Sequence, residues 1–181
     1  MKRRHWIFGG AATAALAAGV AWRGHREAAE PGPPALGDDG VGAAEADFWR
    51  MQFEQPDGQL LDMATLRGQP LLLNFWGTWC PPCIKEMPDL DRFARRFAPQ
   101  GWRVLGLAVD NPKAVREFLA RSPVSYTIGL AGFEGSELSR KLGNTQSGLP
   151  FTVAFDRQGR ARQRKAGATT LDELARWAES A

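Results

Sequence analysis

From residue 48 onwards, short apolar runs alternate with segments whose apolar residues recur every three or four positions. Short apolar runs are typical of buried strands, and the wider spacing is typical of amphipathic helices. The predicted strands are residues 48–53, 60–63, 71–75, 104–109, 126–128, 151–155 and 160–165. The predicted helices are residues 81–97, a helix opening at Asn111, residues 136–142 and residues 170–180. The first two strands flank a Pro-Asp-Gly turn and predict a hairpin, and the rest predicts an α/β domain.

The N-terminus has a different pattern. Residues 2–4 are basic, residues 7–22 are apolar and uncharged, and Arg23 and Arg26 follow. This order is typical of an export signal. A helix of this length reaches about 24 Å, short of a hydrocarbon core of about 30 Å. Residues 1–23 are therefore predicted to be a cleaved signal peptide or a short retained membrane anchor, with the domain carried outward.

Residues 24–47 show no apolar period and are rich in Pro, Gly and Ala. Such a segment cannot bury enough surface to offset the entropy of ordering. We predict a flexible linker that lets a domain at residues 48–181 reach partners near a membrane.

Charge adds little to this picture. The chain holds 23 basic and 20 acidic residues, for a net charge of +3. Arg160, Arg162 and Arg164 are predicted to share one face of a strand. A solvated edge strand explains them better than a nucleic-acid patch, because charge on an edge strand discourages association between sheets. We expect no nucleic-acid partner.

Candidate chemistry comes from the two cysteines of the chain, Cys80 and Cys83. A disulfide closing so short a loop constrains the unfolded chain little, which argues against a structural staple. Zinc usually needs four ligands, and the two histidines, His5 and His25, flank the apolar leader. A haem attachment site would need histidine at position 84, where Ile84 stands. Redox chemistry remains.

The predicted helix at residues 81–97 places Cys80 at a helix N-terminus, with Pro81 and Pro82 in the first turn, where missing N–H groups cost nothing. Unpaired N–H groups and the positive end of the helix dipole favour a thiolate there. We expect Cys80 to be exposed and nucleophilic. Cys83, one turn inside, is expected to be more buried and to attack the mixed disulfide that Cys80 forms.

The sequence from Asn74 to Cys83, followed by Lys-Glu-Met-Pro at residues 85–88, resembles the TlpA/ResA-like branch of the thioredoxin superfamily. The later Gly-Leu-Pro at residues 148–150, directly before a strand, strengthens the resemblance. It covers about residues 48–181. It implies a thioredoxin fold, a central mixed sheet flanked by helices, with an N-terminal hairpin and a TlpA-type central insertion between Asp110 and Gly148.

Carried over residue by residue, the resemblance implies the site. Cys80 matches the attacking cysteine and Cys83 the resolving one. Pro150 matches a cis-proline beside the active site, and Leu149 matches a neighbour that holds a substrate strand. Trp79 is implied to shape the surface beside Cys80. The expected substrate-binding surface consists of Trp79, Pro81, Pro82, Leu149 and Pro150.

Glu86 matches a carboxylate that the family places near the cysteines. It is expected either to take the proton of Cys83 and tune the pKa values of the pair, or to be an ordinary exposed helix residue. Asn74 stands where cytosolic thioredoxin carries a buried aspartate. Asparagine cannot accept a proton in that way, so proton handling is expected to fall to Glu86 or to water.

The resemblance implies an exported disulfide reductase, either secreted into the periplasm or tethered to the inner membrane by residues 7–22. The expected partners are a membrane thiol donor and a cysteine-containing exported client, with apocytochrome c and cytochrome c maturation as the example. We expect a monomeric domain, no bound cofactor and no metal. The alternatives are a disulfide oxidant or isomerase of the same fold, a peroxiredoxin-type peroxidase, and a thiol-based metal chaperone.

Overall fold

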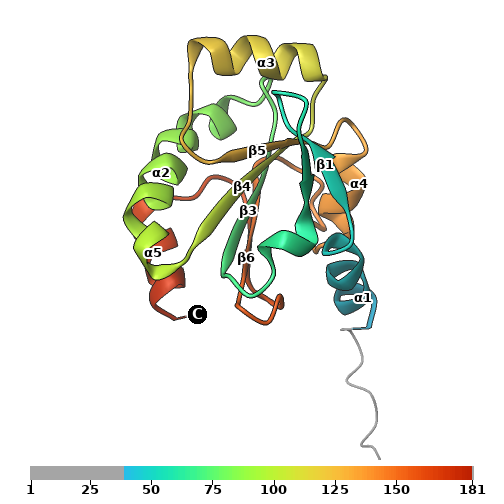
Figure 1. Ribbon diagram of the computed structural model, residues 1–181, viewed down its shortest axis with the longest axis vertical. Coiled ribbons are helices and arrows are strands. Elements are labelled where there is room, and N and C mark those ends of the chain that lie inside the picture. Colours follow the sequence, from blue (N-terminus) through green and yellow to red (C-terminus); the bar gives the residue numbers. More distant parts are fainter. Residues whose placement is uncertain (1–38, 181) are drawn as a thin grey trace, which may run out of the picture. The chain divides into compact units, whose positions relative to one another are not determined.

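The computed structural model describes residues 39–180, which build one mixed sheet with helices on both faces (Figure 1). Its strands are β1 (Gln52–Glu54), β2 (Leu60–Asp62), β3 (Leu71–Trp76), β4 (Arg103–Ala108), β5 (Thr127–Leu130), β6 (Phe151–Phe155) and β7 (Ala161–Ala166). They are ordered β2-β1-β5-β4-β3-β6-β7. The three central strands β5, β4 and β3 run parallel, and the outer strands pair antiparallel. The predicted N-terminal hairpin is confirmed as β1–β2.

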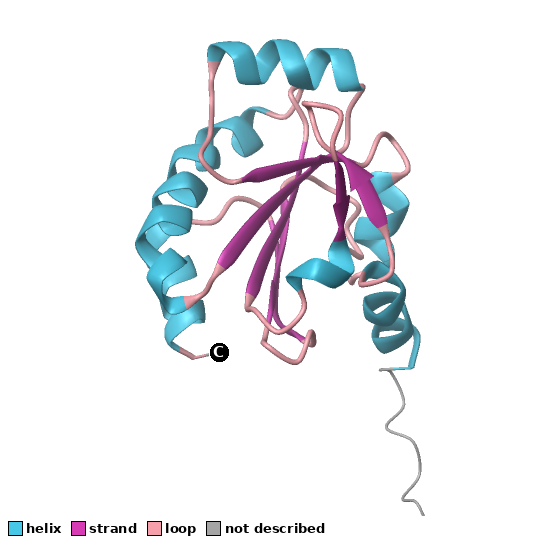
Figure 2. Cartoon of the chain, viewed as in Figure 1, coloured by secondary structure: helices cyan, strands magenta, loops and turns pink. Residues whose placement is uncertain are grey.

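The helices cover the sheet in two layers (Figure 2). They are α1 (Asp39–Phe48), α2 (Pro81–Phe97), α3 (Pro112–Arg121), α4 (Gly135–Lys141) and α5 (Leu171–Glu179), with short 3-10 turns at Met63–Leu66 and Ala98–Gln100. Apolar residues of α2, α3 and α5 pack in one cluster, and those of α1 and α4 pack in the other. The mixed sheet between helical layers is the predicted fold class.

The central strand β3 explains why two cores form. Its side chains alternate between the faces of the sheet, as in any strand. Leu71, Leu73 and Phe75 enter the cluster under α1 and α4, whereas Leu72 and Trp76 enter the cluster under α2. The whole strand is buried because both faces are covered, which is why its sequence is almost continuously apolar.

The linker prediction is wrong for residues 39–47, which form most of α1. Ala44 and Phe48 lie one helical turn apart and are both buried against the sheet. The Phe48 ring stacks on Phe155 with centroids 5.4 Å apart. Glu45 also forms an ion pair with Arg164 of β7. Burial of the Phe48 ring and the Glu45–Arg164 ion pair compensate for the entropy lost when this segment becomes ordered. The segment shows no apolar period in the sequence.

The strand predicted at residues 48–53 is correct only in its second half. The helix ends at Phe48, and the strand begins at Gln52. Phe48 and Trp49 are both buried, so the alternation that a strand requires is broken there. Trp49 Nε1 donates to the carbonyl oxygen of Gly159 at 2.8 Å, which fixes the turn against the β6–β7 hairpin.

β7 is an edge strand, as predicted. It begins at Ala161, so Arg160 lies in the preceding turn and does not share a strand face with Arg162 and Arg164. Arg160 and Arg162 instead lie near the carboxylate of Asp156.

The predicted signal peptide or anchor (residues 1–23) and residues 24–38 of the predicted linker lie outside the described residues. Within residues 39–180, no helix combines the length and apolarity that crossing a membrane requires. The segment between Asp110 and Gly148, expected as a TlpA-type insertion, contains α3, β5 and α4.

Candidate active site at the start of helix α2

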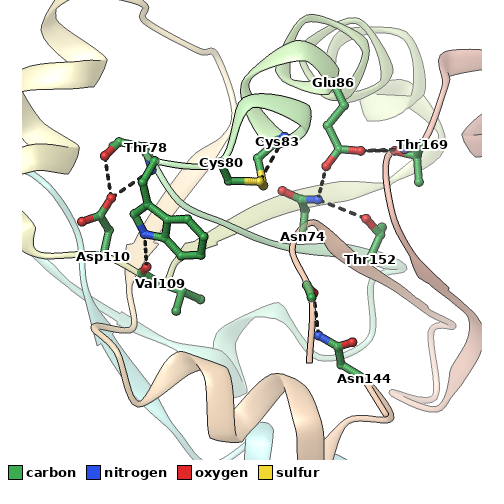
Figure 3. Close-up of a disulfide and its surroundings, with 12 residues drawn as sticks. Asn74, Thr78, Cys80, Cys83, Glu86, Val109, Asp110, Asn144, Thr152 and Thr169 are labelled. Carbon is green, nitrogen blue, oxygen red and sulfur yellow. Dashed lines mark hydrogen bonds between the residues drawn. A yellow bond between two sulfur atoms is a disulfide. The ribbon is translucent and has the colours of Figure 1, made fainter. Parts of the chain in front are cut away.

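The Cys80–Cys83 pair lies where β3 leads into α2. A short loop, residues 77–79, joins the end of β3 to Cys80, which caps the helix. The backbone N–H of Cys83 donates to Cys80 Sγ at 3.3 Å, and the two sulfurs form a disulfide (Figure 3). The cap geometry means that a Cys80 thiolate, once released by reduction, would face the positive end of the helix.

Both cysteines are buried in the disulfide form, so the expected exposure of Cys80 is wrong. Cys80 is 3 % exposed and Cys83 is 0 % exposed. Both belong to the apolar cluster under α2, together with Trp76 and Met87. A disulfide across one helical turn holds the Cys80 sulfur against the helix, where this cluster surrounds it. The expected order nevertheless holds, because Cys83 is the more buried of the two.

The loop before Cys80 is tied to the end of the neighbouring strand β4. The backbone N–H and the hydroxyl of Thr78 both donate to one carboxylate oxygen of Asp110, at 2.9 and 2.6 Å. Trp79 Nε1 donates to the carbonyl oxygen of Val109 at 3.2 Å (Figure 3). Asp110 is itself buried. These bonds fix the backbone that delivers Cys80 to the helix start.

Gly77 is required by the position of the Trp79 ring. A Cβ atom added at Gly77 would lie 2.8 Å from Trp79 Nε1, closer than any side chain tolerates. The indole is held by its bond to Val109, so a side chain at position 77 would have to displace the ring and break that bond. Trp79 is 59 % exposed and, next to Cys80, forms an open apolar surface.

The three prolines of the expected site come from two segments, the start of α2 and the residue before β6. Pro81 and Pro82 occupy the first turn of α2 and are exposed. The Leu149–Pro150 peptide bond is cis, as predicted. Pro150 directly precedes Phe151, which pairs with Phe75 in the sheet, so Pro150 lies beside the end of β3 that leads to Cys80.

The loop that carries Leu149 is held by a buried amide. Asn144 is 1 % exposed, and its Nδ2 donates to the carbonyl oxygen of Gly148 at 2.9 Å. Beyond the proline, the N–H of Gly167 donates to the Pro150 carbonyl oxygen at 2.8 Å. Leu149 is half-buried and packs against the cluster that contains both cysteines.

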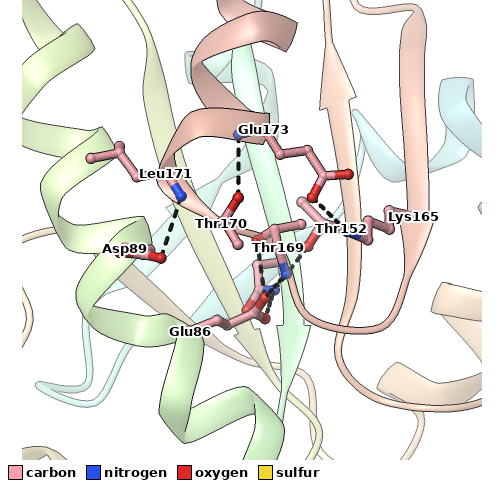
Figure 4. Close-up of polar contacts among 9 residues, drawn as sticks. Glu86, Asp89, Thr152, Lys165, Thr169, Thr170, Leu171 and Glu173 are labelled. Atoms are coloured by element: carbon pink, nitrogen blue, oxygen red, sulfur yellow. Dashed lines mark hydrogen bonds and ion pairs between the residues drawn. The ribbon is translucent and has the colours of Figure 1, made fainter.

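Glu86 is a buried carboxylate and not an exposed helix residue. It lies one turn after Cys83 in α2 and is 2 % exposed. Its Oε2 accepts bonds from the N–H and the hydroxyl of Thr169, at 2.6 and 2.9 Å (Figure 4). Its Oε1 accepts a bond from Asn74 Nδ2 at 2.8 Å.

Burial raises the pKa of the Glu86 carboxyl above its ordinary value. The hydrogen bonds from Thr169 and Asn74 and the charge of Lys165 oppose this rise without cancelling it. Lys165 is itself bonded to Glu173 of α5 (Figure 4). Glu86 is therefore a buried carboxyl group with a raised pKa, one helical turn from Cys83.

Asn74 links this carboxylate to the sheet. It lies on β3, is 1 % exposed, and donates both to Glu86 and, at 3.0 Å, to Thr152 Oγ1 of β6 (Figure 3).

Among residues 39–180, no group of three or more His, Cys, Asp or Glu side chains could hold a metal ion.

Sequence reasoning missed the residues that hold this site together: Thr78, Asp110, Asn144, Thr152 and Thr169. Asp110 alone carries a signal, because an acidic residue directly after a buried strand lies at the edge where the parallel strands end. The two threonines that contact Asn74 and Glu86 lie far along the chain and resemble ordinary strand and loop residues.

Comparison with known proteins agrees with this architecture. Residues 44–176 match the Redoxin family. A thiol-disulfide oxidoreductase ResA from Geobacillus kaustophilus (strain HTA426) is 30 % identical over 141 residues, covering 77 % of each chain. Among solved structures, a thiol:disulfide interchange protein of the thioredoxin family from Chlorobium tepidum TLS is 26 % identical with a TM-score of 0.62. That match covers 72 % of this chain and 92 % of the other.

A second solved structure, MTB dsbF in mixed oxidised and reduced forms, is also 26 % identical. Its TM-score is 0.64, and the match covers 76 % of this chain and 96 % of that one. These structural matches confirm the predicted thioredoxin fold.

Proposed function

Because this chain belongs to the Redoxin family and is a thiol–disulfide oxidoreductase, we propose that its Cys80–Cys83 pair reduces disulfides of exported proteins outside the cytoplasm. The observation that carries the proposal is the position of the pair, at a helix N-terminus beside the exposed Trp79. The apolar leader at residues 7–22 supports a site beyond the membrane, either by secretion or by tethering.

Two exchanges complete the reduction. In the dithiol state, the Cys80 thiolate attacks a sulfur of the client disulfide, forming a mixed disulfide and releasing one client thiolate. The Cys83 thiolate then attacks Cys80 Sγ, which restores the Cys80–Cys83 disulfide and releases the second client thiolate. A dithiol donor in the membrane reduces the pair again and becomes oxidised. An exported protein with paired cysteines, such as apocytochrome c, is the client class that we propose.

The surface around the pair suits an extended client. Trp79, Pro81 and Pro82 offer exposed apolar atoms on one side of Cys80, and Leu149 with Pro150 borders the end of β3. A client cysteine that docks there meets Cys80 before Cys83, which is fully buried. We propose these five residues as the client-binding surface.

We propose Glu86 as the group that accepts the proton of Cys83 in the second exchange. The two side chains lie one helical turn apart on the same face of α2, which brings their Cβ atoms to within about 6 Å. In its ionised form the carboxylate can accept the proton, and its raised pKa makes the protonated form accessible as well.

The Glu86→Gln variant is expected to slow the second exchange about 100-fold at neutral pH, because general-base catalysis typically contributes at least this factor. In the wild type the rate of this step should rise as pH passes the raised pKa of Glu86, because deprotonation creates the base. The Glu86→Gln variant should show no such rise in rate. The measurement is release of glutathione from a Cys80–glutathione mixed disulfide across a pH series.

Glu137→Gln is the matched control for this experiment. Glu137 lies on α4, pairs with Arg140 and is not among the groups that act on Glu86. It should keep the wild-type pH profile. A Glu86→Gln profile that coincides with that of the wild type would remove Glu86 from proton transfer.

The reduction potential of the Cys80–Cys83 pair tests the proposed direction of electron flow. A reductase is expected near the thioredoxin value of about −270 mV, and a strong oxidant lies near −120 mV on the same scale. Equilibration against glutathione or dithiothreitol, read by alkylation of free thiols, measures the value. A result near the oxidising end would contradict the reductase and favour a disulfide oxidant or isomerase with the same residues.

A further inference from the structure

The amide of Asn74 is satisfied on one side only. Its Nδ2 donates to Glu86 Oε1 at 2.8 Å and to Thr152 Oγ1 at 3.0 Å, which uses both N–H groups. Its Oδ1 is buried and accepts no hydrogen bond from any protein group. Buried polar atoms without a partner are rare in native proteins, and a redox role is one of the recognised reasons for them.

The unpartnered oxygen faces the cysteine pair. Asn74 lies two residues from both Leu72 and Trp76 along β3, so its side chain is on the same face of the sheet as theirs, the face that α2 covers. The nitrogen is fixed by its bond to Glu86, one turn after Cys83. Figure 3 shows the amide nitrogen directed at Glu86 and Thr152, and the oxygen on the opposite branch directed at the disulfide.

The disulfide form has no hydrogen to offer this oxygen. Sulfur in a disulfide carries no proton, whereas a cysteine thiol is a hydrogen-bond donor. When a dithiol donor reduces the pair, the S–S bond breaks, two S–H bonds form, and the donor becomes a disulfide. Cys83 is 0 % exposed, so its new S–H group must find an acceptor inside the protein.

We propose that Asn74 is a positioning residue of the redox centre, whose Oδ1 accepts a hydrogen bond from the Cys83 thiol in the reduced state while its Nδ2 holds Glu86 beside that thiol. This inference rests on the proposed function, since it concerns the same cysteine pair. The bond stabilises the dithiol relative to the disulfide. It also raises the pKa of the Cys83 thiol, because a hydrogen bond to the neutral form disfavours ionisation.

Several titratable groups face this site, and the test must separate their effects. Cys80 caps α2, and Glu86 lies on it. Lys165 on β7 acts on the charge of Glu86, and the hydroxyl of Tyr126, just before β5, is buried near the same carboxylate. Loss of the Asn74 bond would further raise the pKa of Glu86 and so act on Cys83 indirectly. A cycle that includes Glu86→Gln removes this indirect path.

The test compares Asn74→Leu with Thr152→Val, in the wild type and in Glu86→Gln. Asn74→Leu removes the acceptor and is expected to weaken the dithiol form about tenfold in equilibrium with dithiothreitol, which is about 30 mV more negative at 29.6 mV per tenfold. Cys83 should also ionise at lower pH, measured by thiolate absorbance in a Cys80→Ser background. The more negative potential and the ionisation of Cys83 at lower pH should both persist when Asn74→Leu is combined with Glu86→Gln.

Thr152→Val is the matched control, because it removes the other side-chain partner of the Asn74 nitrogen and leaves Oδ1 in place. It should keep the wild-type potential. If Asn74→Leu keeps it too, or loses its shift once Glu86 is Gln, the proposed bond to Cys83 is wrong. If no variant, nor the wild type, exchanges with a dithiol, the proposed function fails instead.

A measurement without any change at Asn74 covers the case in which Asn74→Leu does not fold. Infrared spectroscopy of the reduced protein detects S–H stretching, and the Cys80→Ser variant isolates the band of Cys83. A hydrogen-bonded thiol absorbs at lower frequency than a free one. A Cys83 band at the free-thiol frequency would overturn the proposal.

Discussion

Cys80→Ser is expected to reduce disulfide turnover to the rate without enzyme. A serine hydroxyl cannot form the mixed disulfide that starts the exchange. Cys83 cannot substitute for Cys80 because it lies one turn inside the helix and is the more buried of the two. The fold should survive, since serine is a preferred helix cap and can accept the Cys83 N–H that Cys80 Sγ accepts in the wild type. Insulin reduction with dithiothreitol as electron source measures the loss, and circular dichroism checks the fold.

Cys83→Ser provides the comparison for this loss. It removes the same number of sulfur atoms and the same disulfide, but leaves the attacking thiol in place. One equivalent of a small disulfide should therefore still react with Cys83→Ser and not with Cys80→Ser. If Cys80→Ser reacts at the wild-type rate, or the two variants behave alike in this single exchange, the assignment of Cys80 as the attacking residue is incorrect.

Cys83→Ser is expected to accumulate a mixed disulfide between Cys80 and its client. The first exchange proceeds, but no second thiol attacks Cys80 Sγ from one turn inside the helix. In cells that express the full chain, the adduct should appear as a slower band on non-reducing gels and disappear with dithiothreitol. Mass spectrometry of the adduct identifies the client.

The double variant Cys80→Ser/Cys83→Ser is the control for adducts that do not involve the pair. It should give no band, and Cys80→Ser alone should give little, because Cys83 is buried. Normal catalytic turnover by Cys83→Ser would show that Cys83 is not the resolving residue. Adducts restricted to cytoplasmic proteins would contradict the proposed location outside the cytoplasm.

Local sequence signals predicted the elements around the cysteines well. The run at residues 71–75 and the helix at residues 81–97 are found as β3 and α2, because a doubly covered strand and an amphipathic helix each impose their own apolar period. The segment at residues 39–53 was predicted poorly. Its order comes from Phe48 and Trp49 packing on the β6–β7 hairpin, which no local pattern records.

The sequence by itself determined the redox pair and its place at a helix start, since these follow from cysteine spacing and proline chemistry. The cis-proline was implied by the resemblance of the surrounding motif to a known family. Only the tertiary structure decided that Cys80 is covered in the disulfide form and that Glu86 is buried. It alone brought Asn74, Thr152 and Thr169 together around that carboxylate. The physical reason is that burial and hydrogen bonding between strands and helices distant in the chain depend on how the layers pack. The pKa of Glu86 follows from that packing and not from its neighbours in sequence.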